Sequence, residues 1–211
     1  MCIIKHLKKE SLEPSFSEDD DHLHVYLYFH DHGFPEKLGH TDIGAGNTIL
    51  SYGCHDPKHR SFPDYSGNGI LIQAERLPFL YYHATSGEMI IDYTLNLTEE
   101  ETMSVLHKTD ALLKQAVPWH CPYDTDPKAN DYASKLYQNI SCTFFQMKDS
   151  AFETYNALNN NCVTFVYDLV KEYLPSFNPL IHTPHAFLQY MESQFSHHDP
   201  HICTRDVYYS K

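Results

Sequence analysis

The sequence predicts an α+β fold in which an antiparallel sheet packs against helices. Segments with the period-2 alternation of strands gather between residues 22 and 94. Segments with the three- and four-residue apolar spacing of helices follow at 98–117 and 162–174. The turn AGN between two of the strand segments suits a hairpin, which makes those strands antiparallel neighbours.

Length and composition predict one domain preceded by an arm. The chain has 211 residues, of which 42% are apolar, enough to fill one sizeable core. Residues 1–21 end in the acidic cluster SEDDD and show little apolar periodicity, so we interpret them as a surface arm. Residues 22–211 then form the domain, without an internal repeat.

The predicted strands begin with HLHVYLYFHD, where four apolar residues alternate with histidines and tyrosines, as in a strand with one buried face. LGHTDIG and TILSYG form a hairpin through AGN, whose glycine and asparagine tolerate positive φ. Residues 54–69 are rich in proline and glycine and predict a long loop. ILIQAERLPFLYYHAT and EMIIDYTLNL then continue as strand-like runs.

The first predicted helix is LTEEETMSVLHKTDALLKQAV. Thr98 and Glu101 match a capping box at its start. Its predicted apolar face consists of Met103, Leu106, Leu113 and Val117. Residues 118–130 then form an irregular insertion, and 131–147 fit a helix or a strand equally well.

Two further helices complete the expected fold. Apolar residues recur at helical spacing through CVTFVYDLVKEYL until Pro175, so this helix starts at Cys162. In HTPHAFLQYMESQF, Thr183 is the expected N-cap and Pro184 the first helical residue.

Charge and composition exclude several classes of partner. The chain carries 15 basic and 28 acidic side chains, with a formal net charge of −13, so we expect no nucleic-acid partner. No segment approaches the roughly 18 apolar residues of a membrane span, and the first residues lack the order of a signal peptide. Six cysteines without a C-x-x-C pair favour a reduced compartment. We expect a cytoplasmic protein, or one exported without a cleavable signal, with no cofactor.

Cys162 is the first candidate for chemistry, because it follows three asparagines and opens a helix. A thiol in the first helical turn lies near unsatisfied backbone N–H groups, whose partial positive charge favours the nucleophilic thiolate. Asn160 and Asn161 can cap this helix or donate to a developing oxyanion. Judged by position alone, a cysteine that merely packs is the commoner case.

A nucleophilic cysteine needs a histidine base, which the fold and not the sequence brings close. His40 is the best candidate, because it begins a short strand followed by a hairpin, a rigid mounting for a base. Taken alone, a histidine at a strand end is more often bonded to a backbone carbonyl.

The order of short motifs along the chain resembles that of the permuted papain-like cysteine hydrolases. GH precedes a short strand and SYG, a capped helix comes next, and NC and TP then each open a helix. That superfamily includes the NlpC-type peptidases, the lecithin retinol acyltransferase group and the PPPDE deubiquitinases. The resemblance covers residues 22–192 and implies a papain-like, circularly permuted NlpC-type fold with a cysteine–histidine site.

Within this resemblance, Cys162 corresponds to the nucleophile and His40 to the general base. The family places an orienting residue on the strand next to the histidine, which points to Ser51. Asp42 is the alternative, because it returns to the face of His40 two residues along the strand and holds an imidazolium better than a hydroxyl does. The implied reaction is thiolate attack on an amide or ester, ending in hydrolysis or acyl transfer.

Two other functions compete with this interpretation. CHDPKH and HHDPHIC contain natural zinc ligands, but neither has an established ligand spacing, so we expect no functional metal site. A non-catalytic interaction module is the stronger alternative, since 16 tyrosines and 12 phenylalanines offer aromatic anchors. For an enzyme, the acidic chain favours a basic or neutral peptide or protein substrate, including a host protein met after export.

Overall fold

The computed structural model describes residues 2–6, 24–31, 39–61, 66–174, 177–178 and 183–209. The strands are β1 (Cys2–His6), β2 (Val25–Asp31), β3 (His40–Ala45), β4 (Thr48–Gly53), β5 (Ser66–Asn68), β6 (Ile70–Glu75), β7 (Met89–Leu95), β8 (Ala116–Pro118), β9 (Cys142–Met147), β10 (Thr154–Asn156) and β11 (Ile202–Tyr209). The helices are α1 (Arg76–Thr85), α2 (Glu99–Gln115), α3 (Tyr132–Asn139), α4 (Cys162–Val170) and α5 (Pro184–Ser196), with a 3₁₀ turn at Pro122–Asp124.

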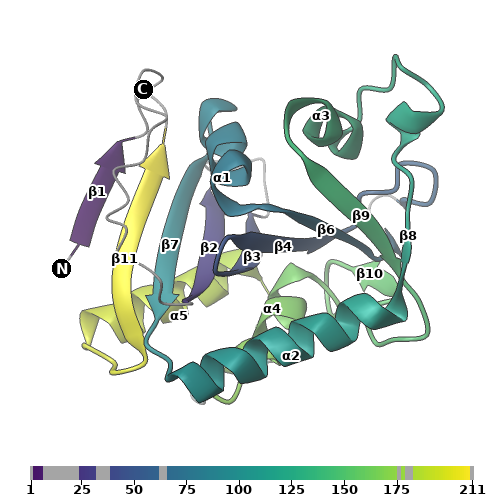
Figure 1. The fold of residues 1–211 in the computed structure, drawn as a ribbon. Coiled ribbons are helices and arrows are strands. Elements are labelled where there is room, and N and C mark those ends of the chain that lie inside the picture. Colours follow the sequence, from purple (N-terminus) through teal and green to yellow (C-terminus); the bar gives the residue numbers. More distant parts are fainter. Residues whose placement is uncertain are drawn as a thin grey trace.

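Nine of these strands form one sheet in the order β1-β11-β7-β2-β3-β4-β6-β9-β8 (Figure 1). Neighbouring strands are antiparallel, except β1 and β11, which run parallel. β5 and β10 pair separately as a short antiparallel ribbon. The predicted α+β class, an antiparallel sheet packed against helices, is confirmed. In the described part of the chain, no helix has the length and apolar content needed to cross a membrane.

Each face of the sheet carries its own core. α2, α4 and α5 pack against one face, and α1 and α3 cover the other (Figure 1). β2 serves both cores: Leu27 and Phe29 belong to the first, and Tyr28 belongs to the second. The prediction that only one face of this strand is buried is therefore wrong, since His30 is also only 3% exposed. The reason is that α1 covers the face that the alternation assigned to solvent.

The run after residue 70 divides into a strand and a helix. β6 ends at Glu75, and the expected continuation of the strand is instead α1. Phe79, Leu80 and His83 recur at three- and four-residue spacing and are buried, which is a helical period. Pro78 lies in the first turn, where its missing N–H costs no helical hydrogen bond. The many aromatic and apolar residues of this segment concealed that period.

Several boundaries match the prediction and two segments do not. The β3–β4 hairpin turns at Gly46, which has a φ of 57°. The ambiguous stretch 131–147 contains both α3 and β9. Residues 2–6, which the prediction assigned to a surface arm, form the edge strand β1. The C-terminal tail contains strand β11, which was not predicted. Residues 7–23 lie outside the described part.

α2 has the predicted capping box, but its buried face only partly matches the prediction. The Thr98 side chain accepts from the Glu101 N–H, and Glu101 accepts from the Thr98 N–H at 2.8 Å. Met103 is 40% exposed, whereas Val105 is fully buried. The helix ends at Gln115, before the predicted 117, and Val117 lies in β8, where it is 42% exposed. Leu106 and Leu113 of the predicted face are partly buried, and Leu113 packs against the core, so the predicted face is correct in part.

Candidate active site

α4 begins at Cys162 as predicted, and Asn161 is confirmed as its cap. Asn161 Oδ1 accepts hydrogen bonds from the N–H groups of Val163 and Thr164 at 2.9 and 3.2 Å. The Asn161 N–H in turn donates to Thr164 Oγ1 at 2.8 Å, which completes a capping box. The N–H of Cys162 has no hydrogen-bond partner among the described residues. An unsatisfied N–H at a helix start is available to a bound acceptor.

The side chain of Asn160 braces the loop before α4. Its Nδ2 donates to the carbonyl oxygens of Ala151 and Thr154, each at 2.6 Å. Both amide hydrogens are therefore used, and none is left for an oxyanion. The Asn161 Nδ2 donates to the carbonyl oxygen of Ala157 at 2.8 Å. These amides fix the approach of the chain to Cys162, and the backbone N–H of Cys162 is the better oxyanion donor.

The first turn of α4 brings Cys162 to His40, as predicted. His40 is the first residue of β3, and its imidazole is hydrogen-bonded to the Cys162 side chain. Cys162 is 2% exposed, and the His40 side chain is 22% exposed. The Cys162 side chain is therefore buried, while the imidazole of His40 still meets solvent.

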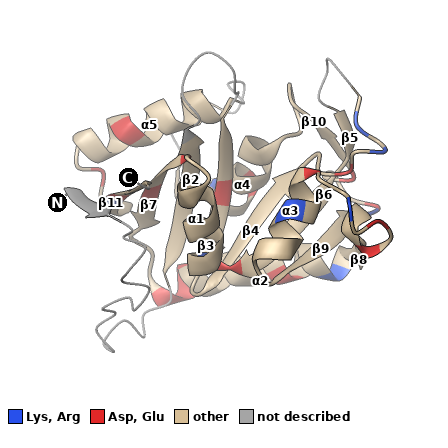
Figure 2. Cartoon of the chain, turned by 90° about the horizontal axis from the view of Figure 1, so that it is seen from above, with Lys and Arg blue, Asp and Glu red and all other residues tan. Residues whose placement is uncertain are grey.

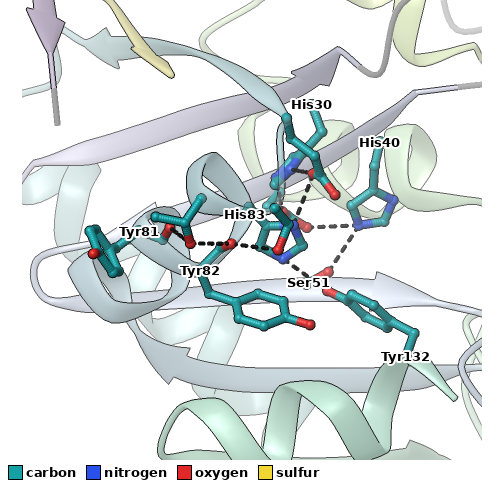
Figure 3. Close-up of polar contacts among 11 residues, drawn as sticks. His30, His40, Ser51, Tyr81, Tyr82, His83 and Tyr132 are labelled. Carbon is teal, nitrogen blue, oxygen red and sulfur yellow. Dashed lines mark hydrogen bonds and ion pairs between the residues drawn. The ribbon is translucent and has the colours of Figure 1, made fainter. Parts of the chain in front are cut away.

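Asp42 and Ser51 both contact the same ring nitrogen of His40. His40 Nε2 lies 2.8 Å from Asp42 Oδ1 and 2.9 Å from Ser51 Oγ. Figure 3 shows His40 and Ser51 pointing toward each other across β3 and β4. The Ser51 contact has hydrogen-bond geometry, whereas Asp42 Oδ1 forms an ion pair without it.

The charges at this site favour a protonated His40 beside an ionised Asp42. Burial lowers the pKa of His40, but the negative charges of Asp42 and Cys162 raise it, and the pKa ends well above its ordinary value. Burial raises the pKa of Asp42, but His40 and His30 outweigh that effect and hold the pKa well below its ordinary value. A buried, ionised Asp42 therefore stabilises the proton on His40.

Asp42 also links this pair to a second polar cluster. Its Oδ2 lies 2.7 Å from Nε2 of His30, the residue opposite His40 in the β2–β3 register. His30 Nδ1 and His83 Nδ1 each lie 2.9 Å from Glu88 Oε2. The hydroxyl of Tyr132 lies 3.1 Å from His83 Nε2, and Figure 3 shows these rings gathered beside His40.

Tyr155 is a further neighbour of the sulfur that the sequence did not single out. It lies on β10, and its hydroxyl is hydrogen-bonded to the Cys162 side chain. Burial raises the pKa of Tyr155 and the charge of Cys162 raises it further, so the phenol stays protonated and donates. Its ring packs against Tyr52 with centroids 5.5 Å apart. No local motif marks Tyr155, because the ribbon of β5 and β10 brings it to the site.

The two histidine-rich segments considered as metal sites do not assemble as such. In the first, Asp56 Oδ2 lies 2.7 Å from His59 Nδ1 and accepts from Asn68 Nδ2 at 3.2 Å, which braces the loop. His55 instead packs its ring on Tyr132, 5.0 Å between centroids. Within the described ranges, only His30, His83 and Glu88 gather three potential ligand atoms; residues 54–59 and 197–203 do not. His30 was missed because its strand face was assigned to solvent.

Acidic side chains are spread over several elements, including α2 and α5 (Figure 2).

Comparisons of the chain with protein-family models, with curated proteins and with solved structures give no match. The geometry of the site therefore carries the functional argument.

Proposed function

We propose that this protein is a cysteine hydrolase or acyltransferase with Cys162 as nucleophile and His40 as base. The observation that carries the proposal is the contact between a thiol in the first turn of a capped helix and an imidazole backed by a buried carboxylate. Each part has a role in thiol catalysis: the helix start and the imidazole favour the thiolate, and Asp42 holds the imidazolium. This arrangement also suits the permuted papain-like resemblance of the sequence.

The reaction follows from these positions. The Cys162 thiolate attacks the carbonyl carbon of an amide or ester, a C–S bond forms, and the carbonyl oxygen becomes an oxyanion. We assign the N–H of Cys162 and the hydroxyl of Tyr155, which neighbours the sulfur, as the donors to that oxyanion. His40 then protonates the leaving nitrogen or oxygen, whose bond to carbon breaks.

The acyl-enzyme is resolved by the reverse sequence of proton transfers. Water or an amine attacks the thioester and gives its proton to His40, the C–S bond breaks, and the thiolate returns. The acceptor decides between hydrolysis and acyl transfer. The net charge of −13 favours a basic or neutral peptide or protein as acyl donor, through the long-range field of the chain.

The test is intact-mass spectrometry after incubation with an electrophilic probe that mimics an amide or ester. We expect one adduct per chain, mapped by peptide analysis to Cys162. Cys162→Ala should abolish the adduct, and His40→Ala should slow its formation by about 100-fold or more, because the base is lost. Cys203→Ala is the matched control and should label like the wild type, since Cys203 is an exposed cysteine away from the site.

Solvent exposure alone makes the opposite prediction. Cys203 is exposed and Cys162 is buried, so a protein without an activated thiol would react at Cys203 first. Labelling that tracks exposure, together with unfolding of Cys162→Ala in circular dichroism, would assign Cys162 a structural role and end the proposal.

A further inference from the structure

A cluster next to the candidate active site brings together three side chains from separate elements. His30 lies on β2, His83 in the last turn of α1, and Glu88 in the turn that leads into β7. Gly87, with a φ of 89°, reverses the chain after α1 and places Glu88 over both imidazoles. The side chains of His30, His83 and Glu88 are 1%, 5% and 15% exposed, so the cluster is closed except at the carboxylate.

One potential ligand atom from each of the three side chains lies close to the other two. His30 Nδ1 and His83 Nδ1 each lie 2.9 Å from Glu88 Oε2, and the three atoms lie within 4.8 Å of one another. Two imidazole nitrogens and one carboxylate oxygen form a donor set that proteins use for zinc and other divalent transition metals.

The other nitrogen of each imidazole is already fixed by a neighbour. His30 Nε2 lies 2.7 Å from Asp42 Oδ2, and His83 Nε2 lies 3.1 Å from the Tyr132 hydroxyl. Metal-bound histidines commonly donate their second N–H to such a carboxylate or oxygen, which fixes the tautomer and the ring orientation. Both rings can therefore donate through Nε2 and direct the lone pair of Nδ1 toward Glu88.

We propose that His30 Nδ1, His83 Nδ1 and the Glu88 carboxylate bind one divalent transition-metal ion of the zinc type. Such an ion would neutralise the two carboxylates, Glu88 and Asp42, that meet at His30 in the interior. Three protein ligands leave a fourth position for water on the side of Glu88, the most exposed of the three.

This site shares no ligand residue with the proposed thiol chemistry. It uses neither of the histidine-rich segments that the sequence suggested, and its ligands come from elements that only the fold brings together. Asp42 joins the two sites, because its oxygens meet His30 on one side and His40 on the other. A bound ion would therefore hold His30 and, through it, Asp42.

The test is zinc binding by chelator-treated full-length protein, measured by competition with a chromophoric chelator and by X-ray absorption of the zinc-loaded wild type. We expect each chain to bind one zinc ion tightly, the tight equivalent, with nitrogen and oxygen ligands at about 2.0–2.2 Å and no sulfur. Glu88→Gln and His83→Gln should each lower the affinity for this zinc ion at least 100-fold. Tyr132→Phe should weaken it about 10-fold, because it removes only the partner of His83.

The matched controls are His59→Gln and His197→Gln, which alter the two histidine-rich segments and should keep the tight equivalent. Cys162→Ala should also keep it, so that failure of the thiol proposal does not affect this result. The absence of a tight equivalent in the wild type, or sulfur among its ligands, would overturn the proposal, leaving Glu88 as an acceptor for two imidazoles. Retention of the equivalent in folded Glu88→Gln and His83→Gln would also overturn it. The absorption spectrum needs no variant, so a variant that fails to fold does not remove the test.

Discussion

Asp42 is a fully buried carboxylate between two imidazoles, His40 on its own strand and His30 on the next. Ser51 reaches the same nitrogen of His40 but carries no charge. A carboxylate stabilises an imidazolium more than a hydroxyl does, because the interaction in a buried site is charge on charge. Asp42 is therefore the stronger candidate for the orienting group.

We predict that Asp42→Asn slows probe labelling of Cys162 by an order of magnitude or more, whereas Ser51→Ala slows it less than about 10-fold. The measurement is the labelling rate by mass spectrometry at neutral pH, with circular dichroism of both variants as the control for folding. A larger effect of Ser51→Ala would make the hydroxyl the orienting group.

His55 makes the stability of the folded state depend on pH. Burial lowers its pKa to about 3, with a further decrease from the charge of His40. The ordinary value is 6.5, so between these values the unfolded chain binds a proton that the folded chain does not. The free energy of unfolding should therefore fall as the pH drops below 6.5. Asp42 opposes the shift, while Arg60 and His83 add to it.

We predict that, between pH 7 and pH 5, the free energy of unfolding of the wild type falls by about 1 kcal/mol more than that of His55→Gln. This value is reduced because part of the His55 side chain still meets solvent. Urea unfolding at pH 7, 6 and 5 measures the two free energies. His107→Gln, at an exposed position of α2, should keep the wild-type dependence. Equal slopes for the wild type and His55→Gln would show that His55 is not the group responsible.

At the scale of elements, the start of α4 couples stability to the site. Asn161 satisfies two N–H groups of the first turn, and the same cap sets the position of Cys162. Thr98 caps α2 in the same way, but that helix begins far along the chain from the thiol and carries no site residue. The two caps therefore form a matched pair for separating stability from chemistry.

We predict that Asn161→Ala and Thr98→Ala each lower the free energy of unfolding by about 1 kcal/mol. Only Asn161→Ala should also slow probe labelling of Cys162, because it releases the helix start beneath the sulfur. Urea unfolding and the labelling rate are the measurements. Asn161→Asp keeps the acceptor oxygen and should recover part of the stability and part of the labelling rate. Equal labelling rates in Asn161→Ala and Thr98→Ala would contradict the role of the cap.

At the scale of the whole molecule, β11 joins both cores across the sheet. It pairs with β7 from Ile202 to Tyr208 and with β1 on its other edge. Ile202 belongs to the core under α4 and α5, and Tyr208 belongs to the core under α1. Arg205 also bonds Glu192 of α5, with Nη2 to Oε1 at 2.6 Å. β1, by contrast, pairs only with β11 among the described strands.

We predict that a chain ending at residue 201 loses cooperative thermal unfolding, because β7 then has an unpaired edge and both cores lose buried residues. A chain lacking residues 1–6 should keep a cooperative transition and Cys162 labelling. Thermal melts by circular dichroism compare the two. A wild-type melt for the chain ending at 201 would refute this role of β11.

Local signals in the sequence determined the class of fold and several element boundaries. The caps at Thr98, Asn161 and Thr183 and the AGN hairpin are encoded by consecutive residues, because helix starts and tight turns are stabilised by hydrogen bonds within four or five positions. The placement of Cys162 at a helix start and of His40 at a strand start followed from the same signals.

Tertiary structure alone decided which faces are buried and which side chains meet. The alternation in β2 could not show that α1 covers Tyr28 and His30, since a second covered face depends on where a later helix packs. His30 and Glu88 are 58 positions apart, and no local period relates them. Contacts over such separations arise from strand register and helix packing, which depend on the whole chain at once, so the cluster of His30, His83 and Glu88 and the place of Tyr155 beside Cys162 became visible only in the folded molecule.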